Sequence, residues 1–567
     1  MIDHMKKLVW CLTVAAVFEG VAAPLLAPVF SKNAVIQRDV AAPVWGWAGK
    51  DETVVLTVSR VEGSKTNELA RYEAVASQAV PKAMAPRERE LWRWEAKVGP
   101  FPAGLDYRLV VEGTRAPKGR KPQRVEADIA FGDVWLCAGQ SNMELTLRKC
   151  RDATNEIARG TNPLLKLYNL PWGASAVPEE CVRGGWTPCD SENLGAHPKK
   201  DFSGVAFFFG RELVKDVKVP LGLVNCSMGG TCIEAWISSN ALETAGEKYR
   251  APYAKYAKAN GLNKPGVMFN AKVAVLKDMA VKGVLWYQGE WNTHAPQEYA
   301  NLLRTMIGDW RGRLTAADPK RPLPFSVVLL AGFGGPNANA AEPQNNWALL
   351  REAQIEGARS LPSVGLASAM DTDPVKGDLH PPHKQELGRR LARWAFAEAY
   401  GGKGETDGPT FKSVTKKGSV LHVSFAHVGQ GLVATDGQEL CGFAVASEKG
   451  NPVAARAVIK GDTVAVASPK VVDPCRVWYA WKQNPATANL GNADGFPALP
   501  FRAEVPPAPP AAAPIADRNP YSFCYHIVYD NREWAAINRD LKAIKKSGAG
   551  AIRADIMWPR RSCRFPS

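Results

Sequence analysis

The hydrophobic pattern of residues 24–126 is that of short strands separated by turns. The runs at 54–58 and 107–111 are rich in Val and Leu, and glycines such as Gly63 and Gly104 interrupt the region. Runs rich in β-branched residues and bounded by turn residues are typical of antiparallel strands. We therefore expect an N-terminal β-sandwich-like domain over residues 24–126.

Between residues 127 and 403 the pattern changes to an alternation of strands and helices. Apolar runs typical of buried strands lie at 133–138, 221–225, 283–287, 325–330 and 364–369. Segments with apolar residues at helical spacing lie at 202–217, 268–279, 299–310, 347–359 and 384–400. This alternation predicts an α/β domain, in which helices cover both faces of a parallel sheet. In such domains ligands bind at the carboxyl ends of the strands.

From residue 404 to 504 the chain returns to a two-residue alternation, as in Leu421, Val423 and Phe425, which predicts a C-terminal β-sandwich-like domain. A Pro/Ala-rich linker follows at 505–516. The remaining residues, 517–567, contain an amphipathic helical pattern at 533–546 and a strand pattern at 551–556. This piece is too short to bury a core of its own. It resembles the opening of the (β/α) barrel of a glycoside hydrolase, so we expect a truncated domain that is poorly ordered or docked on its neighbour.

The first 23 residues have the pattern of a signal peptide. Lys6 and Lys7 precede an apolar stretch at 8–18, and small residues at 21–23 offer a cleavage site. We therefore expect a secreted or periplasmic protein. No later segment has about 20 uninterrupted apolar residues, so we expect no membrane insertion. The net charge of +15 comes from Lys and Arg residues scattered along the chain, a distribution that argues against nucleic acid as a partner and leaves an acidic glycan open.

Cysteine spacing leaves two possibilities open. Export permits disulfides, and Cys181 with Cys189, or Cys226 with Cys232, are close enough in the chain to close loops. Free, buried thiols are at least as good an interpretation. No Cys/His cluster has the spacing of a metal site, so we expect no metal and no cofactor.

Ser141 stands where an apolar run ends in a glycine and a helix is expected to begin, in Gly139-Gln140-Ser141-Asn142-Met143. A serine at this place has its hydroxyl at the carboxyl edge of the sheet, beside the free N–H groups of the first helical turn. Acyl transfer needs such an attacking oxygen next to donors for an oxyanion. The alternative is a serine that only caps the helix, and the two interpretations have about equal weight on this pentapeptide alone.

Three other strand ends carry residues suited to the same chemistry. Gly229 and Gly230 follow one strand, where a backbone N–H can approach a substrate, although a plain tight turn is the favoured explanation on this segment alone. Gln288 and Asn292 follow another and are candidate oxyanion donors or members of a polar loop. Asp378 and His380 follow a third, where an imidazole base oriented by a carboxylate would be wanted. Because Met143 replaces the second glycine of a G-x-S-x-G elbow, the common α/β-hydrolase arrangement is excluded.

Together these residues closely resemble the motifs of sialate O-acetylesterases, carbohydrate esterases of the SGNH-hydrolase superfamily. The matches cover about residues 28–502 and occur in order at 132–143, 229–231, 233–236, 286–290, 309–311, 350–354 and 378–381, with Lys384, Gly388 and Arg389. The resemblance implies a three-layer SGNH domain flanked by β domains, with Ser141 as nucleophile and His380 as base. It implies an oxyanion hole formed by the N–H groups of Ser141 and Gly229 with the side chain of Gln288 or Asn292, Gln288 being preferred.

The orienting group for His380 stays open, because the superfamily usually has Asp-x-x-His and this chain has Asp378-x-His380. The orienting group is either Asp378 or a backbone carbonyl. Asp371 and Asp373 are less favoured alternatives. The function that follows is removal of O-acetyl groups from sugars through an acetyl-serine intermediate. Deacetylation of xylan or another plant polysaccharide is a second hypothesis, and an inactive carbohydrate-binding protein is a third.

Overall fold

The computed structural model describes residues 26–81, 91–115, 122–181, 184–245, 261–373 and 376–505, together with two short strands at 523–525 and 552–554. They belong to two units, Met1–Val505 and Pro506–Ser567. The predicted signal peptide, nearly all of the linker and the helix expected at 533–546 lie outside the described residues. The strand expected at 551–556 is present as β28 (Ile552–Ala554), which pairs in parallel with β27 (Phe523–Tyr525).

A parallel sheet forms the centre of the first unit, and its strands run in the order β10-β9-β11-β8-β13-β15-β16. All of these neighbours pair in parallel except β10, which is antiparallel to β9. The strands are β8 (Arg124–Gly139), β9 (Asn162–Asn169), β10 (Thr187–Cys189), β11 (Leu221–Ser227), β13 (Gly283–Tyr287), β15 (Phe325–Leu329) and β16 (Val364–Ser368). The predicted α/β class and its five strands are therefore confirmed.

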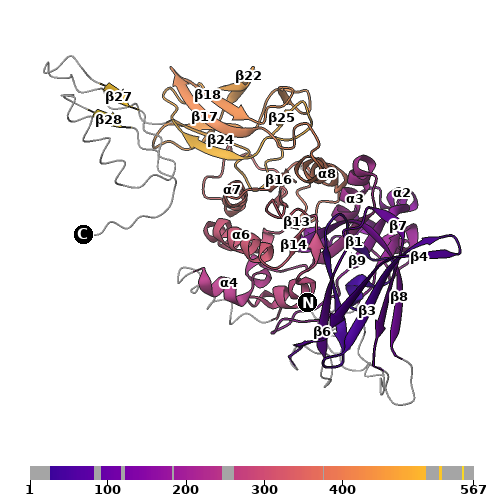
Figure 1. Cartoon of the computed structure of the whole chain (residues 1–567). Coiled ribbons are helices and arrows are strands. Elements are labelled where there is room, and N and C mark those ends of the chain that lie inside the picture. The colour runs from indigo at the N-terminus through magenta and orange to yellow at the C-terminus, as the bar shows by residue number, and fades with distance from the viewer. Residues whose placement is uncertain are drawn as a thin grey trace, which may run out of the picture. The chain divides into compact units, whose positions relative to one another are not determined.

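Helices cover both faces of this sheet, as Figure 1 shows. Alternate residues of β8 point to opposite faces, so that Trp135 packs with α3 and α8, whereas Leu136 belongs to the hydrophobic cluster that contains α6 and α7. The helices are α1 (Ser141–Glu144), α2 (Ala153–Ala158), α3 (Gly204–Val217), α4 (Ser239–Thr244), α6 (Pro296–Arg311), α7 (Asn346–Arg359) and α8 (Gln385–Tyr400). This is the predicted three-layer arrangement.

The helix predicted at 268–279 is not one regular helix. It consists of a π-helical segment (Phe269–Val273) and a 3₁₀ turn (Ala274–Leu276), and the chain then enters the short strand β12 (Ala280–Val281), which pairs with β14 (Thr315–Ala316). Lys272 in the π segment is buried and bonds to the carbonyl of Pro171, so a tertiary contact accompanies the irregular winding.

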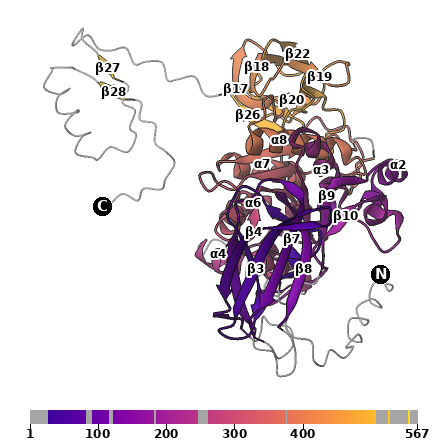
Figure 2. The same cartoon turned by 45° about the vertical axis from the view of Figure 1, so that its right-hand side comes forward.

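The N-terminal domain is a β-sandwich that shares a strand with the central sheet. The first half of β8 pairs with β1 and β7, and its second half pairs with β11 and β13. The boundary proposed at residues 126 and 127 thus lies inside one continuous strand, which Figure 2 shows running from the sandwich into the α/β layer. The other strands are β1 (Val35–Gln37), β2 (Ala42–Ala48), β3 (Thr53–Glu62), β4 (Lys65–Val75), β5 (Gln78–Ala79), β6 (Trp92–Val98) and β7 (Gly104–Gly113).

A buried polar cluster marks the point where β8 passes between the two sheets. Asp133 is fully buried, and its carboxylate accepts hydrogen bonds from Gln37 Nε2 at 2.8 Å and from the guanidinium of Arg38 at 3.1–3.2 Å. Gln37 Oε1 in turn accepts from Val134 N at 3.0 Å. The cluster therefore ties the end of β1 to the middle of β8.

The C-terminal domain is built from two four-stranded antiparallel sheets, β17-β18-β23-β22 and β21-β20-β24-β26, and the pair β19-β25. Leu421, Val423 and Phe425 are buried as their alternation predicts. The strands are β17 (Thr410–Lys417), β18 (Val420–Ala426), β19 (Leu432–Ala434), β20 (Phe443–Ala446), β21 (Val453–Ala454), β22 (Arg456–Lys460), β23 (Thr463–Ala467), β24 (Arg476–Tyr479), β25 (Leu490–Asn492) and β26 (Phe501–Glu504).

The disulfides considered from the sequence are not formed. Cys226 and Cys232 are free thiols in the core, and Cys189 is a free thiol whose Sγ donates to the carbonyl of Gly160. Burial raises the pKa of the Cys226 thiol to about 12. Among the described residues, no helix is long and apolar enough to cross a membrane.

Candidate active site

The carboxyl end of β8 requires a glycine. Gly139 has φ +141°, and a Cβ at this position would lie 2.1 Å from the carbonyl oxygen of Tyr287 on the neighbouring strand β13. The next residue, Gln140, is the N-cap of α1, and its backbone N–H donates to the same Tyr287 carbonyl at 3.0 Å. The chain therefore turns sharply out of the sheet, and Ser141 becomes the first residue of α1.

Ser141 and His380 are 239 positions apart in the sequence and in direct contact in space. The distance between His380 Nε2 and Ser141 Oγ is 2.7 Å. The hydroxyl is thus held by an imidazole, and the N-cap position of α1 belongs to Gln140, whose side chain forms no capping bond. The structure therefore places Ser141 as a base-linked hydroxyl and not as a helix cap.

The surroundings of His380 favour the neutral imidazole. Burial, and next the positive charge of Lys384, lower the pKa of His380 below its ordinary value of 6.5, while the nearby Asp378 carboxylate acts in the opposite direction. A neutral imidazole can accept a proton from Ser141, as a general base must at neutral pH.

Asp378 contacts the backbone of His380. Its Oδ1 accepts from His380 N at 3.0 Å, and no hydrogen bond to His380 Nδ1 is formed by the residues that the structure describes. The two alternative acids are engaged elsewhere: Asp371 pairs with Arg390 at 2.6 Å, and Asp373 Oδ2 accepts from Asp378 N at 3.3 Å. The carboxylate of Asp378 therefore shapes the histidine loop and does not bond to the ring.

The predicted oxyanion donors differ in their availability. The N–H of Ser141 begins the first turn of α1 and, among the described residues, donates to no acceptor. The N–H of Gly229 lies beside Ser141 but donates to Glu144 Oε2 at 2.6 Å. A Cβ on Gly229 would lie 2.7 Å from that oxygen and 3.4 Å from Ser141 Cβ, so Glu144 and Ser141 border the same face of Gly229.

Gln288 and Asn292 are buried behind the site, and their amides are occupied. Gln288 Nε2 lies within 3.1 Å of Gln140 Oε1, Thr231 O and Asn292 Oδ1, which exceeds the number of hydrogens it can donate. Asn292 Nδ2 donates to Glu234 Oε2 at 2.9 Å, and its Oδ1 accepts from Ile233 N. The structure therefore does not present Gln288 as a free donor, and both amides instead connect three strand ends.

A buried polar network that the sequence analysis missed supports the turn that carries Ser141. Asn142 Nδ2 donates to Glu290 Oε1 at 2.5 Å and to the carbonyl of Leu379 at 2.9 Å, and its Oδ1 accepts from Lys384 Nζ at 2.6 Å. Because Leu379 precedes His380, Asn142 links the serine turn directly to the histidine loop. Asn142 and Glu290 lie within the matched segments 132–143 and 286–290, and Lys384 lies beside the histidine motif. These positions were the only signal for the network in the sequence.

Burial perturbs both charged members of this network. It lowers the pKa of Lys384 to about 8 and raises that of Glu290 above its ordinary value, although the hydrogen bond from Asn142 favours the Glu290 carboxylate. The ammonium of Lys384 also lies over the ring of Tyr287, 5.0 Å from its centroid.

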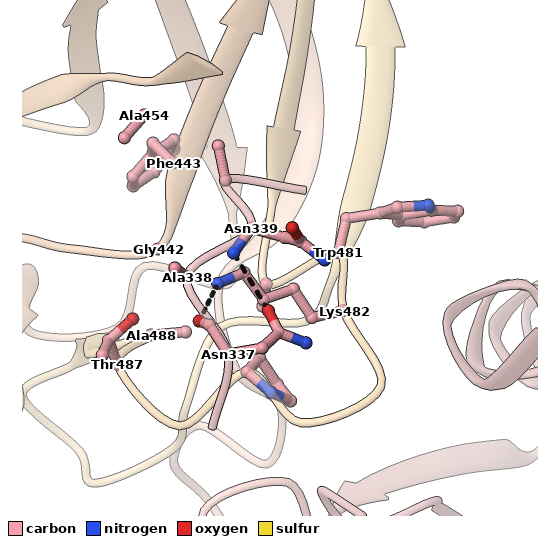
Figure 3. Close-up of a pocket in the computed structure, with 13 residues that line it drawn as sticks. Asn337, Ala338, Asn339, Gly442, Phe443, Ala454, Trp481, Lys482, Thr487 and Ala488 are labelled. Carbon is pink, nitrogen blue, oxygen red and sulfur yellow. Dashed lines mark hydrogen bonds between the residues drawn. The ribbon is translucent and has the colours of Figure 1, made fainter. Parts of the chain in front are cut away.

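A separate pocket of about 240 Å³ lies between the loop at 337–340 and the C-terminal β domain. Figure 3 shows Asn337 accepting hydrogen bonds there from Asn339 N and Lys482 Nζ. None of the residues near Ser141 lines this pocket, which is therefore distinct from the candidate active site.

The chain is similar to carbohydrate esterases in both sequence and structure. Residues 131–397 match the family described as carbohydrate esterase, sialic acid-specific acetylesterase. The sialate O-acetylesterase of Homo sapiens is 30% identical over 397 residues, which cover 68% of this chain and 72% of the human protein. That of Rattus norvegicus is 27% identical over 422 residues, which cover 67% and 74%.

A solved structure extends the likeness to the fold. The structure of a carbohydrate acetylesterase from Xanthomonas citri is 30% identical in sequence and superposes with a TM-score of 0.70, covering 85% of this chain and 100% of the other. The likeness therefore includes the flanking β domains as well as the α/β layer.

Proposed function

The chain belongs to the sialic acid-specific acetylesterases, a family of carbohydrate esterases, and we propose that its carbohydrate O-acetylesterase activity uses Ser141 as the nucleophile and His380 as the base. The observation that carries this proposal is the 2.7 Å contact between His380 Nε2 and Ser141 Oγ. Two side chains from distant segments meet in the geometry that nucleophilic acyl transfer requires.

The reaction proceeds in two steps. His380 Nε2 takes the proton of Ser141 as the hydroxyl oxygen attacks the acetyl carbonyl, and the C–O bond to the sugar breaks as the same imidazole protonates the leaving alcohol. His380 then deprotonates a water molecule, which attacks the acetyl-serine; the bond from the acetyl carbon to Ser141 Oγ breaks, His380 returns the proton to Oγ, and acetate is released. The carbonyl oxygen is negative in both tetrahedral intermediates, and the N–H of Ser141 together with that of Gly229 would stabilise it.

Ser141→Ala tests the assignment. We expect the loss of at least about 10³-fold in kcat on p-nitrophenyl acetate, because the variant has no oxygen to acylate, with an unchanged thermal midpoint. The neighbouring Ser227→Ala is the matched control, since Ser227 Oγ donates to Asn225 and does not contact His380. Near-normal turnover by Ser141→Ala would remove Ser141 from the active site.

The sugar that carries the acetyl group is proposed on the names of the relatives. Sialate O-acetylesterases share 27–30% identity with this chain, which supports O-acetylated sialic acid. An acetylated plant polysaccharide such as xylan is the second candidate, because the segment at 517–567 resembles the start of a glycosidase domain. Acetate release from O-acetylated sialic acid and from acetylated xylan, compared at equal enzyme concentration, separates the two.

We also propose that the protein is exported, on the signal-peptide pattern of residues 1–23 alone. The mass of the mature protein recovered outside the cytoplasm tests this, because cleavage after Ala23 removes 23 residues.

A further inference from the structure

Glu144 occupies a hydrogen-bond donor that the proposed reaction needs. Its Oε2 accepts from Gly229 N at 2.6 Å, beside the nucleophile. An acetyl oxygen cannot bond to this N–H while the carboxylate does. The Glu144 carboxylate therefore has to move when an ester enters the site, and a substrate that offers it a new donor makes that movement easier.

The other oxygen of the same carboxylate is held by an exposed tryptophan. Trp172 Nε1 donates to Glu144 Oε1 at 2.5 Å, yet the Trp172 side chain is 71% exposed. An aromatic side chain exposed to this extent leaves apolar area in water that a bound ligand can cover. The indole therefore presents an open face next to the carboxylate that borders Ser141.

A buried cation fixes the segment that carries this tryptophan. Lys272 is 1% exposed, and its Nζ donates to the carbonyls of Pro171 at 3.0 Å and Leu170 at 3.5 Å. Burial lowers the pKa of Lys272. A buried lysine that bonds to the two residues before Trp172 holds the backbone there in place, so the exposed indole is presented by a supported segment.

Two more exposed apolar residues belong to segments that contact the neighbours of Ser141. Trp291 is 46% exposed, and its backbone N donates to Gln140; Leu379 is 37% exposed, and its carbonyl accepts from Asn142. Gln140 and Asn142 are the residues on either side of Ser141. Trp291 and Leu379 are therefore further candidates for contact with the C–H faces of a sugar ring.

We propose that Trp172 and Glu144 form the subsite for the sugar ring that carries the acetyl ester, and that Glu144 releases the Gly229 N–H when this sugar binds. The ring stacks on the indole face, and a free hydroxyl beside the ester donates to the Glu144 carboxylate. The carboxylate thus exchanges the Gly229 N–H for the sugar hydroxyl, and the acetyl carbonyl oxygen accepts a hydrogen bond from the Gly229 N–H. The inference rests on the proposed function and names the chemistry of the substrate: an O-acetylated pyranose with a free hydroxyl next to the ester, whose sugar alcohol is the leaving group.

Substitution of Trp172 tests the stacking. The measured quantity is the kcat/KM on a sugar acetate divided by that on p-nitrophenyl acetate, which carries no sugar. We expect Trp172→Ala to lower this ratio by about tenfold and Trp172→Phe, which keeps an aromatic face, by less than about threefold. Acetylated xylo-oligosaccharides and O-acetylated sialic acid are assayed separately, and the substrate whose ratio falls is the one that the subsite holds.

Val472→Ala is the control for removal of an exposed apolar side chain, since Val472 is 85% exposed in the C-terminal domain. It should leave both activities at the wild-type level. If Trp172→Ala keeps the wild-type ratio on both sugars, the indole holds no sugar and the proposal is overturned.

Substitution of Glu144 tests the exchange of donors. Glu144→Ala frees the Gly229 N–H, so we expect about a threefold rise in kcat/KM on p-nitrophenyl acetate, together with about a tenfold fall in the sugar ratio. Glu144→Gln keeps an acceptor, so its kcat/KM on p-nitrophenyl acetate and its sugar ratio should lie between those of the wild type and of Glu144→Ala. An unchanged ratio, or a tenfold loss on p-nitrophenyl acetate, would show that the carboxylate supports the fold of the site and would overturn the proposal.

The two proposals fail in different ways. If the wild-type chain hydrolyses no acetate ester, the proposed function fails. Calorimetric binding of the deacetylated xylo-oligosaccharide and of sialic acid, which needs no turnover, then still tests the subsite: at least one must bind about tenfold more weakly to Trp172→Ala than to the wild type, and equal binding of both overturns the inference.

Discussion

In the proposed reaction His380 acts as a base only while its imidazole is neutral, and the charges around it decide the pH range. Burial and Lys384 lower its pKa below 6.5, and Asp378 raises it. Since the base form is lost as pH falls through this pKa, kcat/KM should decline on acidification with a midpoint below 6.5. Asp378 also accepts a hydrogen bond from the histidine backbone.

Asp378→Asn separates these effects. The asparagine Oδ1 can still accept from His380 N, so the loop keeps its shape, but the negative charge is lost. We expect the acid midpoint of kcat/KM on p-nitrophenyl acetate to move to lower pH and kcat to fall by less than about tenfold. A carboxylate that orients the ring directly is worth about 10⁴-fold when replaced by an amide. A loss of that size would show that Asp378 bonds to the imidazole during the reaction.

The meeting of Ser141 and His380 could be predicted because their signals are local. A glycine at a strand end followed by a serine, and a histidine before a helix, are both visible in a single sequence. The roles expected for Gln288 and Asn292 were not supported, because an amide's value as a donor depends on which acceptors surround it. Glu144 and Trp172 carry no local signal, since their bond joins positions 144 and 172 from different segments.

At the level of elements, α8 begins immediately after the histidine loop and is anchored by a charge in its N-cap residue. Lys384 is fully buried, bonds to Asn142 and keeps a positive charge near His380. Burial of a cation disfavours its protonated form, which is why its pKa falls from 10.5 to about 8.

Lys384→Met makes this cost measurable. In the wild type, the folded state releases the lysine proton near pH 8 and the unfolded state near pH 10.5. Between these values the unfolded state binds more protons, so the free energy of unfolding rises with pH. We expect the unfolding free energy of the wild type minus that of Lys384→Met to increase from pH 8 to pH 10.5, because only the wild type gains stability over this range. The exposed Lys460→Met is the control, and parallel pH profiles for all three proteins would contradict the prediction.

The five predicted strands and four of the five predicted helices of the α/β layer followed from their periodicity, and two other segments show why the rest did not. β9 was not predicted, because Asn162–Asn169 begins with Asn-Pro, a turn signal, and gains its strand conformation by pairing with β10 and β11. The segment 268–279 has helical spacing but winds irregularly around the buried Lys272. In both places tertiary contacts override the local pattern.

At the level of the whole first unit, the N-terminal sandwich and the central sheet share β8, and Asp133 lies at the crossing. This carboxylate is fully buried and accepts from both Gln37 and Arg38. Breaking a buried ion pair by removing one partner is costly, because the remaining charge stays uncompensated.

Asp133→Ala should therefore destabilise the sandwich and the α/β layer together. We expect a loss of about 3 kcal/mol in unfolding free energy, and coincident denaturant transitions by circular dichroism and by loss of esterase activity. Asp128→Ala, on the same strand in an exposed pair with Arg108, is the control and should cost under about 1 kcal/mol. Two separate transitions in the Asp133 variant would mean that the domains unfold independently.

The shared strand also limits how this enzyme can be re-engineered. A chimera that exchanges the N-terminal sandwich at residue 126 would splice two parent sequences inside β8, near its start, seven residues before the crossing at Asp133 and fifteen before Ser141. Likewise, tension applied to the sandwich is transmitted along one uninterrupted backbone to the turn at Ser141. A crossover placed between Gly113, the end of β7, and Arg124, the start of β8, would keep β8 whole and leave the turn at Ser141 on its own strand.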